Sequence, residues 1–324
     1  MTGLRPPPRE EAPSRIALRM LVLIVLVLGA GVTVWTAVTQ QRMELVEDTS
    51  LQELELEPMI SPNGTSINVV REGTGAVPLV LLHDVDIAGS VIWDGVVSTV
   101  DEKFTVMRVD LPGFGLSQRI PSEGTRHTVA SMAVEVGDII DQVFAEPVVI
   151  AGIGLGGEVA AEIAVISPDL VGAVVLVDVD FYKPDGWVEF AEKLPWFGPA
   201  ATFAFDTAGS FSFDRWAPHC AQEGWCPTRS QVEARELAGT IVGTTDSVRA
   251  FRRTPAASLV PSRLGDITVP VHYLWSQQGE VPRESVDRVL EALPAIQVDV
   301  LAEAWKAHLD SPRDVATAIS AATP

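Results

Sequence analysis

The sequence predicts an α/β fold in which a mostly parallel, doubly wound sheet follows one transmembrane helix. Beyond residue 61, apolar runs alternate with helical patterns, and several runs are rich in Val, Ile and Leu without polar alternation. Such runs are typical of parallel strands buried on both faces. Near the N-terminus, the stretch Met20–Val38 contains no charged residue.

This uncharged stretch would rise about 28 Å as a helix, close to the hydrocarbon thickness of a bilayer. Basic residues precede it and acidic residues follow it, namely Arg5, Arg9, Arg15 and Arg19, then Glu44, Glu47 and Asp48. The positive-inside rule then places the N-terminus in the cytoplasm and the main domain outside. The absence of a small-residue cleavage site favours an uncleaved anchor over a signal peptide. We therefore expect a disordered cytoplasmic tail over 1–15, an anchor over 16–39 and an acidic stalk over 40–60.

The composition excludes some classes of partner. The net charge is −20 and the pI about 4.5, which excludes nucleic acid because phosphate binding needs a basic surface. Cys220 and Cys226 are close enough in sequence to form a disulfide outside the cytoplasm, and free thiols are the alternative. We expect no metal site and no cofactor.

The predicted strands and helices alternate through a domain spanning 61–324. The predicted strands are Ser66–Arg71, Pro78–Leu82, Phe104–Val109, Pro147–Ala151, Ala173–Asp178, Val269–Leu274 and Gln297–Leu301. The predicted helices are Ile92–Val100, Val129–Phe144, Gly157–Ile166, Arg283–Leu293 and Pro312–Ala322. Between about 181 and 263 the pattern changes to Trp- and Phe-rich helical sequence, which predicts an inserted cap.

Four segments together resemble the α/β-hydrolase superfamily. They are Val80-Leu81-Leu82-His83-Asp84, Asp110-Leu111-Pro112-Gly113-Phe114-Gly115-Leu116-Ser117, Gly152-Ile153-Gly154-Leu155-Gly156, and Ala307-His308-Leu309-Asp310-Ser311-Pro312. The third is similar to the G-x-S-x-G nucleophile elbow, a sharp turn between a strand and a helix with serine at its apex. The resemblance implies the α/β-hydrolase fold with a cap.

The positions that the resemblance assigns to chemistry carry other residues. The nucleophile falls on Gly154, the acid on Gly279 and the histidine on Trp305, while Asp84 replaces a glycine beside the oxyanion hole. A carboxylate there would oppose a developing oxyanion. Because triad members act as a unit, one loss would remove most of the catalysis.

Other residues could replace the missing groups. Asp84 with His83 could activate a water, His308 lies one helical turn beyond Trp305, and Glu280 adjoins Gly279. For each, a structural role is the competing interpretation, and none supplies a nucleophile at the elbow. Asp178 and Asp180 follow the strand after the elbow, where some family members place their acid; a strand-end cap is the alternative there.

The same glycines also fit a dinucleotide-binding fingerprint. Gly152-x-Gly154-x-x-Gly157 follows a strand, and Asp178 lies about 20 residues further on. Such a fingerprint normally opens its domain, whereas several predicted strands precede this one. We therefore favour it least of the three interpretations.

The sequence leaves open whether this chain is an enzyme and favours a non-catalytic member of the superfamily. We expect a cleft lined by Asp84, Val85, Gly154, Leu155 and Trp305 to hold a small apolar or ester-like ligand, or the cap to contact an envelope protein. The elbow amides could bind a carbonyl or carboxylate without turnover. The alternative is a divergent hydrolase of an ester or related bond that uses activated water instead of serine.

Overall fold

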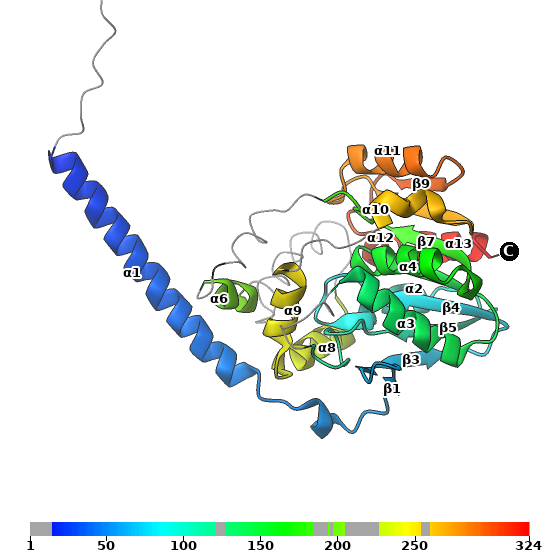
Figure 1. Ribbon diagram of the computed structural model, residues 1–324, viewed down its shortest axis with the longest axis horizontal. Coiled ribbons are helices and arrows are strands. Elements are labelled where there is room, and N and C mark those ends of the chain that lie inside the picture. The colour runs from blue at the N-terminus through cyan, green and yellow to red at the C-terminus, as the bar shows by residue number, and fades with distance from the viewer. Residues whose placement is uncertain are drawn as a thin grey trace, which may run out of the picture.

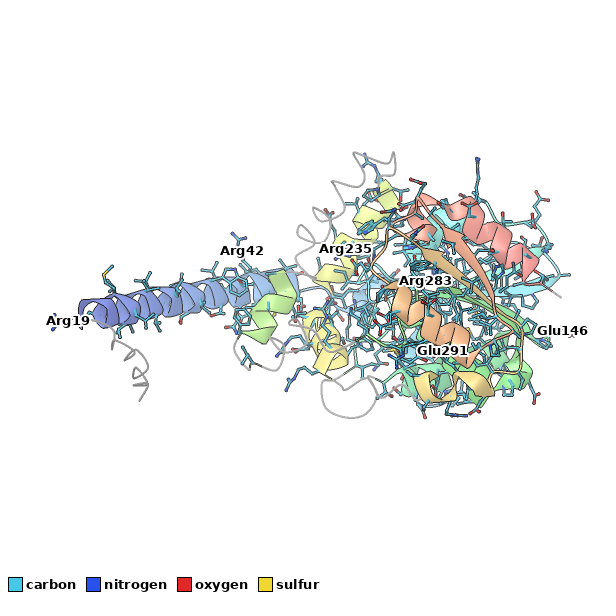
Figure 2. All side chains as sticks on the ribbon, turned by 90° about the horizontal axis from the view of Figure 1, so that it is seen from above. Arg19, Arg42, Glu146, Arg235, Arg283 and Glu291 are labelled. Carbon is cyan, nitrogen blue, oxygen red and sulfur yellow. The ribbon has the colours of Figure 1, made fainter. Side chains whose placement is uncertain are left out.

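A long helix extends from an α/β domain in the computed structural model, which describes residues 15–120, 128–183, 194, 197–204, 227–253 and 260–323 (Figure 1). This helix, α1 (Arg15–Val46), is the one helix of the described residues long and apolar enough to cross a membrane. Arg19 and Arg42 lie near its two ends (Figure 2). Helical structure thus continues from the predicted anchor into the stretch expected to be an acidic stalk.

The domain is built on a seven-stranded sheet with the order β3-β5-β4-β6-β7-β8-β9. Every neighbouring pair is parallel except β3 with β5. The strands are β3 (Val69–Glu72), β4 (Val77–Leu82), β5 (Phe104–Val109), β6 (Val148–Ile153), β7 (Val171–Val177), β8 (Val271–Ser276) and β9 (Gln297–Leu301). The predicted mostly parallel sheet is confirmed.

Helices cover both faces of this sheet (Figure 1). Alternate residues of each strand enter two separate cores, as Val80 and Leu82 do on one face and Leu79 and Leu81 on the other. The first face is covered by α3 (Val129–Val143), α4 (Leu155–Ile166) and α11 (Arg283–Ala292). The second is covered by η2 (Gly89–Trp93), α2 (Asp94–Val97), α12 (Ala307–Asp310) and α13 (Pro312–Ala321).

Two elements differ from the sequence prediction. The strand expected over Ser66–Arg71 is divided at Asn68 into β2 (Ser66–Ile67), which pairs with β1 (Met59–Ile60), and β3. The Asn68 amide N–H donates to Ser117 Oγ at 2.9 Å and its side chain to Asp110 at 2.8 Å, which diverts it from the strand ladder. The helix expected over Ile92–Val100 begins as the 3₁₀ turn η2 and ends at Val97.

The predicted cap follows β7 and precedes β8. Its described elements are α6 (Gly198–Thr202), α8 (Arg229–Thr240), α9 (Thr244–Arg253) and α10 (Val260–Arg263). A capping box begins α8, with Thr228 and Gln231 bonding each other's backbone N–H groups. The turn between α8 and α9 lies beside the segment that follows α1, through a parallel bridge between Thr49 and Ile241.

Candidate ligand site at the elbow

A sharp turn joins β6 to α4 at the position of the predicted elbow. Gly154 occupies its apex with φ 50° and ψ −118°, and α4 begins at Leu155. Close packing surrounds the turn, since a Cβ on Gly156 would lie 2.2 Å from the carbonyl oxygen of Leu82. Glycine at position 156 therefore allows the first turn of α4 to lie close to the end of β4.

The Asp84 carboxylate lies against this apex. The backbone N–H of Leu155 donates to Asp84 Oδ1 at 2.9 Å. A Cβ on Gly154 would lie 2.2 Å from the same oxygen and 2.3 Å from Cγ. In α/β-hydrolases the N–H after the nucleophile is an oxyanion-hole donor. In this chain that donor, which we expected to be open to a ligand carbonyl or carboxylate, is already bound to Asp84.

The histidines near the turn have partners that fix them elsewhere. The fully buried His83 accepts the Leu111 N–H through Nε2 at 2.9 Å and contacts the Asp84 carbonyl through Nδ1 at 2.5 Å. Because Nε2 accepts a backbone N–H, the proton lies on Nδ1. His83 thus ties the end of β4 to the turn after β5 and has no free nitrogen for a water.

His308 lies with the second core. Its ring is 6.0 Å from that of Trp93, centroid to centroid, and it is 3% exposed. Burial and the nearby Lys306 lower its pKa well below the usual histidine value. Its Nδ1 has no hydrogen-bond partner among the described residues. The structure therefore places it as a neutral side chain packed against η2.

A buried carboxylate follows β7, at the alternative acid position. Asp178 has φ 48° and accepts hydrogen bonds from the Ser276 N–H and hydroxyl, both at 2.7 Å, and from the Ala307 N–H at 3.4 Å. Burial raises its pKa despite these bonds. Asp178 joins the ends of β7 and β8 to the start of α12, and no histidine is among its hydrogen-bond partners in the described residues.

The remaining predicted positions lie on the loops after β8 and β9. Gly279 faces the second loop, because a Cβ there would lie 2.7 Å from the Trp305 carbonyl oxygen. Glu280 is exposed. Trp305 is 9% exposed, and its backbone N–H donates to the Asp310 carboxylate at 2.7 Å. Leu155 is buried in the first core, and Val85 packs against the same core. Of the five residues expected to line a cleft, the structure brings Asp84, Gly154 and the Leu155 backbone together.

Sequence reasoning missed Glu158, one turn beyond Gly154. Burial, together with the charges of Asp84 and Asp180, raises its pKa to about 8, and Lys183 opposes this rise. A carboxyl group that is protonated near neutral pH therefore adjoins the elbow. The only sequence signal is its position, because Glu158 is an acidic residue within the apolar run GGEVAAEIAV.

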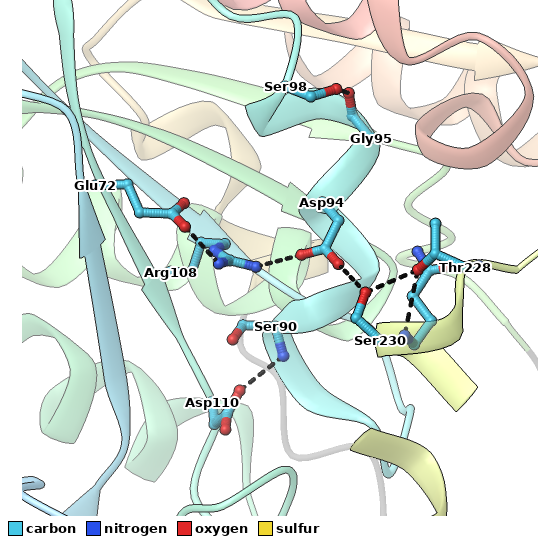
Figure 3. A network of polar contacts seen from close by, with 10 residues as sticks. Glu72, Ser90, Asp94, Gly95, Ser98, Arg108, Asp110, Thr228 and Ser230 are labelled. Carbon is cyan, nitrogen blue, oxygen red and sulfur yellow. Dashed lines mark hydrogen bonds and ion pairs between the residues drawn. The ribbon is translucent and has the colours of Figure 1, made fainter. Parts of the chain in front are cut away.

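The cap is joined to the sheet domain by polar contacts between α8 and the stretch from Asp86 to Asp94. Arg235 on α8 pairs with Asp86 at 2.7 Å, with side chains only 8% and 10% exposed. Asp94 accepts hydrogen bonds from Arg108 at 2.6 Å and from Ser230 on α8 at 2.8 Å. Arg108 also donates a hydrogen bond to Glu72 (Figure 3). This network runs from the sheet edge through α2 to the cap.

Two further predictions concern the cysteines and a metal ion. Cys220 and Cys226 lie outside the described residues. Within the residues that the structure describes, no three His, Cys, Asp or Glu side chains are grouped to hold a metal ion.

Comparison with known proteins identifies the family. The sequence pattern of the alpha/beta hydrolase family matches residues 79–318. A pimeloyl-[acyl-carrier protein] methyl ester esterase of Aeromonas hydrophila is 34% identical over 132 residues, covering 40% of this chain and 48% of the relative. The esterase of that name in Nitrosomonas europaea is 33% identical over 112 residues, covering 35% and 40%. This chain thus spans under half the length of these curated relatives.

Solved structures share the fold at lower identity. An esterase from Thermogutta terrifontis has a TM-score of 0.62 and 21% identity, covering 82% of this chain and 95% of that one. A hydrolase from Pseudomonas aeruginosa has a TM-score of 0.66 and 16% identity, covering 83% and 98%. The sheet order, the elbow and the family match agree, and they exclude the dinucleotide-binding interpretation. The chain belongs to the alpha/beta hydrolase family.

Proposed function

We propose that this protein is a non-catalytic hydrolase-fold protein of the outer face of the cytoplasmic membrane, which binds a small apolar or ester-like ligand beneath its cap. The observation that carries the proposal is the hydrogen bond from the Leu155 N–H to Asp84, directly over Gly154. Gly154 offers no side-chain nucleophile, and beside it this hydrogen bond occupies the N–H that would donate to an oxyanion.

The chemistry of acyl transfer explains why this pair matters. Hydrolysis through serine needs an oxygen nucleophile at the elbow and donors aimed at the oxyanion that develops. Here Gly154 supplies no side chain, and the Leu155 donor faces a carboxylate. A developing oxyanion would meet the Asp84 charge in a partly buried site, where like charges repel more strongly than in water. A neutral, largely apolar ligand avoids that repulsion.

The surrounding side chains support the same conclusion. His83 and Asp178 are held by hydrogen bonds to other groups, and His308 packs against Trp93. No chain of nucleophile, histidine and acid runs through the described residues near Gly154. The site therefore keeps the shape of a hydrolase turn while its polar groups satisfy one another.

The proposed location at the membrane is inferred from α1. Exposed apolar side chains cover its N-terminal half. The charged residues before the apolar stretch are mainly basic and those soon after it, Arg42 apart, are acidic. This supports a single-pass anchor with its N-terminus in the cytoplasm.

A divergent hydrolase is the second candidate, because relatives named as esterases match the chain and because Glu158 adjoins Asp84. A carboxylate and a neighbouring protonated carboxylic acid can act as general base and general acid on a water. In that mechanism Asp84 would take the proton of the water, and Glu158 would donate one to the leaving group.

The test uses the full chain in phospholipid nanodiscs. Turnover of p-nitrophenyl esters with short and long acyl chains is measured beside thermal unfolding with matched alkyl ethers, which cannot be hydrolysed. Asp84→Asn and Glu158→Gln preserve side-chain shape and remove the charge or the proton. Stabilisation by an ether without turnover supports the binding proposal. Turnover that both variants abolish overturns it in favour of the hydrolase. If neither ligand binding nor turnover is found, the small-ligand proposal fails and an envelope protein becomes the partner to seek.

A further inference from the structure

The burial pattern of α1 changes halfway along the helix. From Met20 to Gly31 every side chain is exposed. Beyond that point one stripe is covered, at spacings of three and four residues that place it on one helix face. The covered positions are Val32, Thr36, Thr39, Gln40, Met43 and Val46, with Thr36 at 5% and Thr39 at 7% exposure. The second half of α1 is thus part of the folded domain.

The cap packs against this half of α1 through α6. The rings of Trp35 on α1 and Phe197, the residue before α6, lie 5.5 Å apart. Short and apolar, α6 lies between α1 and α9 (Figure 1), and Ala200, Ala201 and Phe203 are buried there. Cap and anchor therefore pack directly against each other.

A second attachment follows the end of α1. Glu47 accepts the N–H groups of Thr245 at 2.7 Å and Gly243 at 3.3 Å, and also the Thr245 hydroxyl, at the N-terminus of α9. Thr49 bonds the α8–α9 turn in both directions, to the Thr240 carbonyl at 2.8 Å and from the Val242 N–H at 3.0 Å. The cap is thus attached both to α1 and to the segment that follows it.

The height of the first attachment follows from helix geometry. Trp35 lies about 22 Å along the helix axis from Met20, at about 1.5 Å per residue. With Met20 at the inner boundary of a hydrocarbon layer of about 30 Å, Trp35 and Phe197 fall in its outer part, near the interface where aromatic side chains gather. The continuous exposure of α1 from Met20 to Gly31 matches contact with lipid tails.

We infer that the α6 edge of the cap, at Phe197, rests on the outer leaflet of the bilayer and that phospholipids of this leaflet are its partner. The inference rests on the proposed anchoring of α1, and it assigns the cap a membrane-docking surface. An acyl-chain amphiphile of that leaflet would then reach the cap without crossing water, which deepens the proposed preference for an apolar ligand.

The test places a photoreactive aromatic residue at single positions of the full chain in liposomes of phosphatidylcholine and phosphatidylglycerol carrying an alkyne-labelled phospholipid. Phe197 is replaced by p-benzoylphenylalanine, a conservative exchange. Phe144, a second half-buried phenylalanine at the end of α3, is the matched control, and Val34, 63% exposed on α1, reports insertion. Circular dichroism and unfolding midpoints confirm that each variant folds.

We expect lipid adducts from positions 34 and 197 and at least tenfold less from 144. An adduct at 34 with none at 197 overturns the docking of the cap and leaves the anchor intact. Adducts at neither 34 nor 197 overturn the proposed anchoring and the docking together. Equal adducts at 197 and 144 also overturn the inference, because lipid contact would then not be confined to the α6 edge.

Discussion

The carboxylate of Asp84 lies in the space that a side chain on Gly154 would need, 2.2 Å from the position of its Cβ. The two residues are 70 positions apart in sequence, and adjacency of β4 and β6 brings them together. Each makes the other possible, because glycine leaves room for the carboxylate and the Leu155 N–H then holds it.

Restoring serine at the elbow should therefore destabilise the protein. We expect Gly154→Ser to lower the free energy of unfolding by about 1–3 kcal/mol, through the clash with Asp84 and the positive φ. Asp84→Gly should relieve part of this loss, so the double variant should be more stable than the sum of the single effects predicts. Urea unfolding of all four proteins measures the coupling, and strictly additive effects would contradict it.

Glu158 should make stability depend on pH. Its pKa in the folded protein is about 8, above the usual 4.5. Between these two pH values the folded state holds a proton that the unfolded state has lost. Its stabilising effect is complete below about pH 4.5 and is lost as the pH rises through about 8. Glu158→Gln should remove this dependence, whereas Glu291→Gln, at an exposed position, should retain it. Urea unfolding between pH 5 and 9 provides the comparison, and identical profiles for wild type and Glu158→Gln would refute the role.

The Arg235–Asp86 pair should hold the cap. Because both side chains are nearly buried, Arg235→Ala leaves the Asp86 carboxylate without its positive partner, with only the Ala88 N–H still bonded to Oδ1. We expect the free energy of unfolding to fall by about 3–5 kcal/mol. Arg229→Ala, on the same helix, removes an arginine that is 89% exposed and paired with Glu233. This substitution should lower the free energy of unfolding by less than about 1 kcal/mol. Limited proteolysis should show faster cleavage within the cap for Arg235→Ala alone; equal rates for the two variants would count against this role.

Ser276 should stabilise the carboxylate after β7. Ser276→Ala removes the hydroxyl that donates to Asp178 and accepts from the Ala307 N–H at 3.0 Å. Because the buried Asp178 carboxylate then lacks one of its hydrogen-bond donors, we expect the free energy of unfolding to fall by about 1–3 kcal/mol. Ser98→Ala is the control, since Ser98 is an exposed residue whose hydroxyl donates to the Gly95 carbonyl at 2.8 Å. Thermal unfolding distinguishes the two, and equal midpoints would show that Asp178 finds another donor.

Much of the fold was predictable because the apolar runs are long and the turns carry specific residues. The strand predicted at Phe104–Val109 is observed with the same bounds, and the predicted helix at Val129 ends one residue early. Asn68 escaped prediction because its bonds to Ser117 and Asp110 come from distant segments. Local pattern carries no information about such partners.

The turn at Gly154 was predictable from the sequence, whereas the contacts around it were not. Resemblance placed Gly154, Asp84 and Trp305 at chemically important points, yet the bond from Leu155 to Asp84 depends on how two strands pair. His308 shows a second limit, since a spacing of three residues cannot say that its ring faces Trp93. Glu158 acquires its shifted pKa from burial and from charges on other loops.

The attachment of Glu47 to the start of α9 has a mechanical consequence. The cap is inserted between β7 and β8, so α1 is joined to the domain at this insertion as well as through the chain leading to β1. A pull along α1 would therefore load the junction between the cap and the sheet before it reached the short hairpin of β1 and β2.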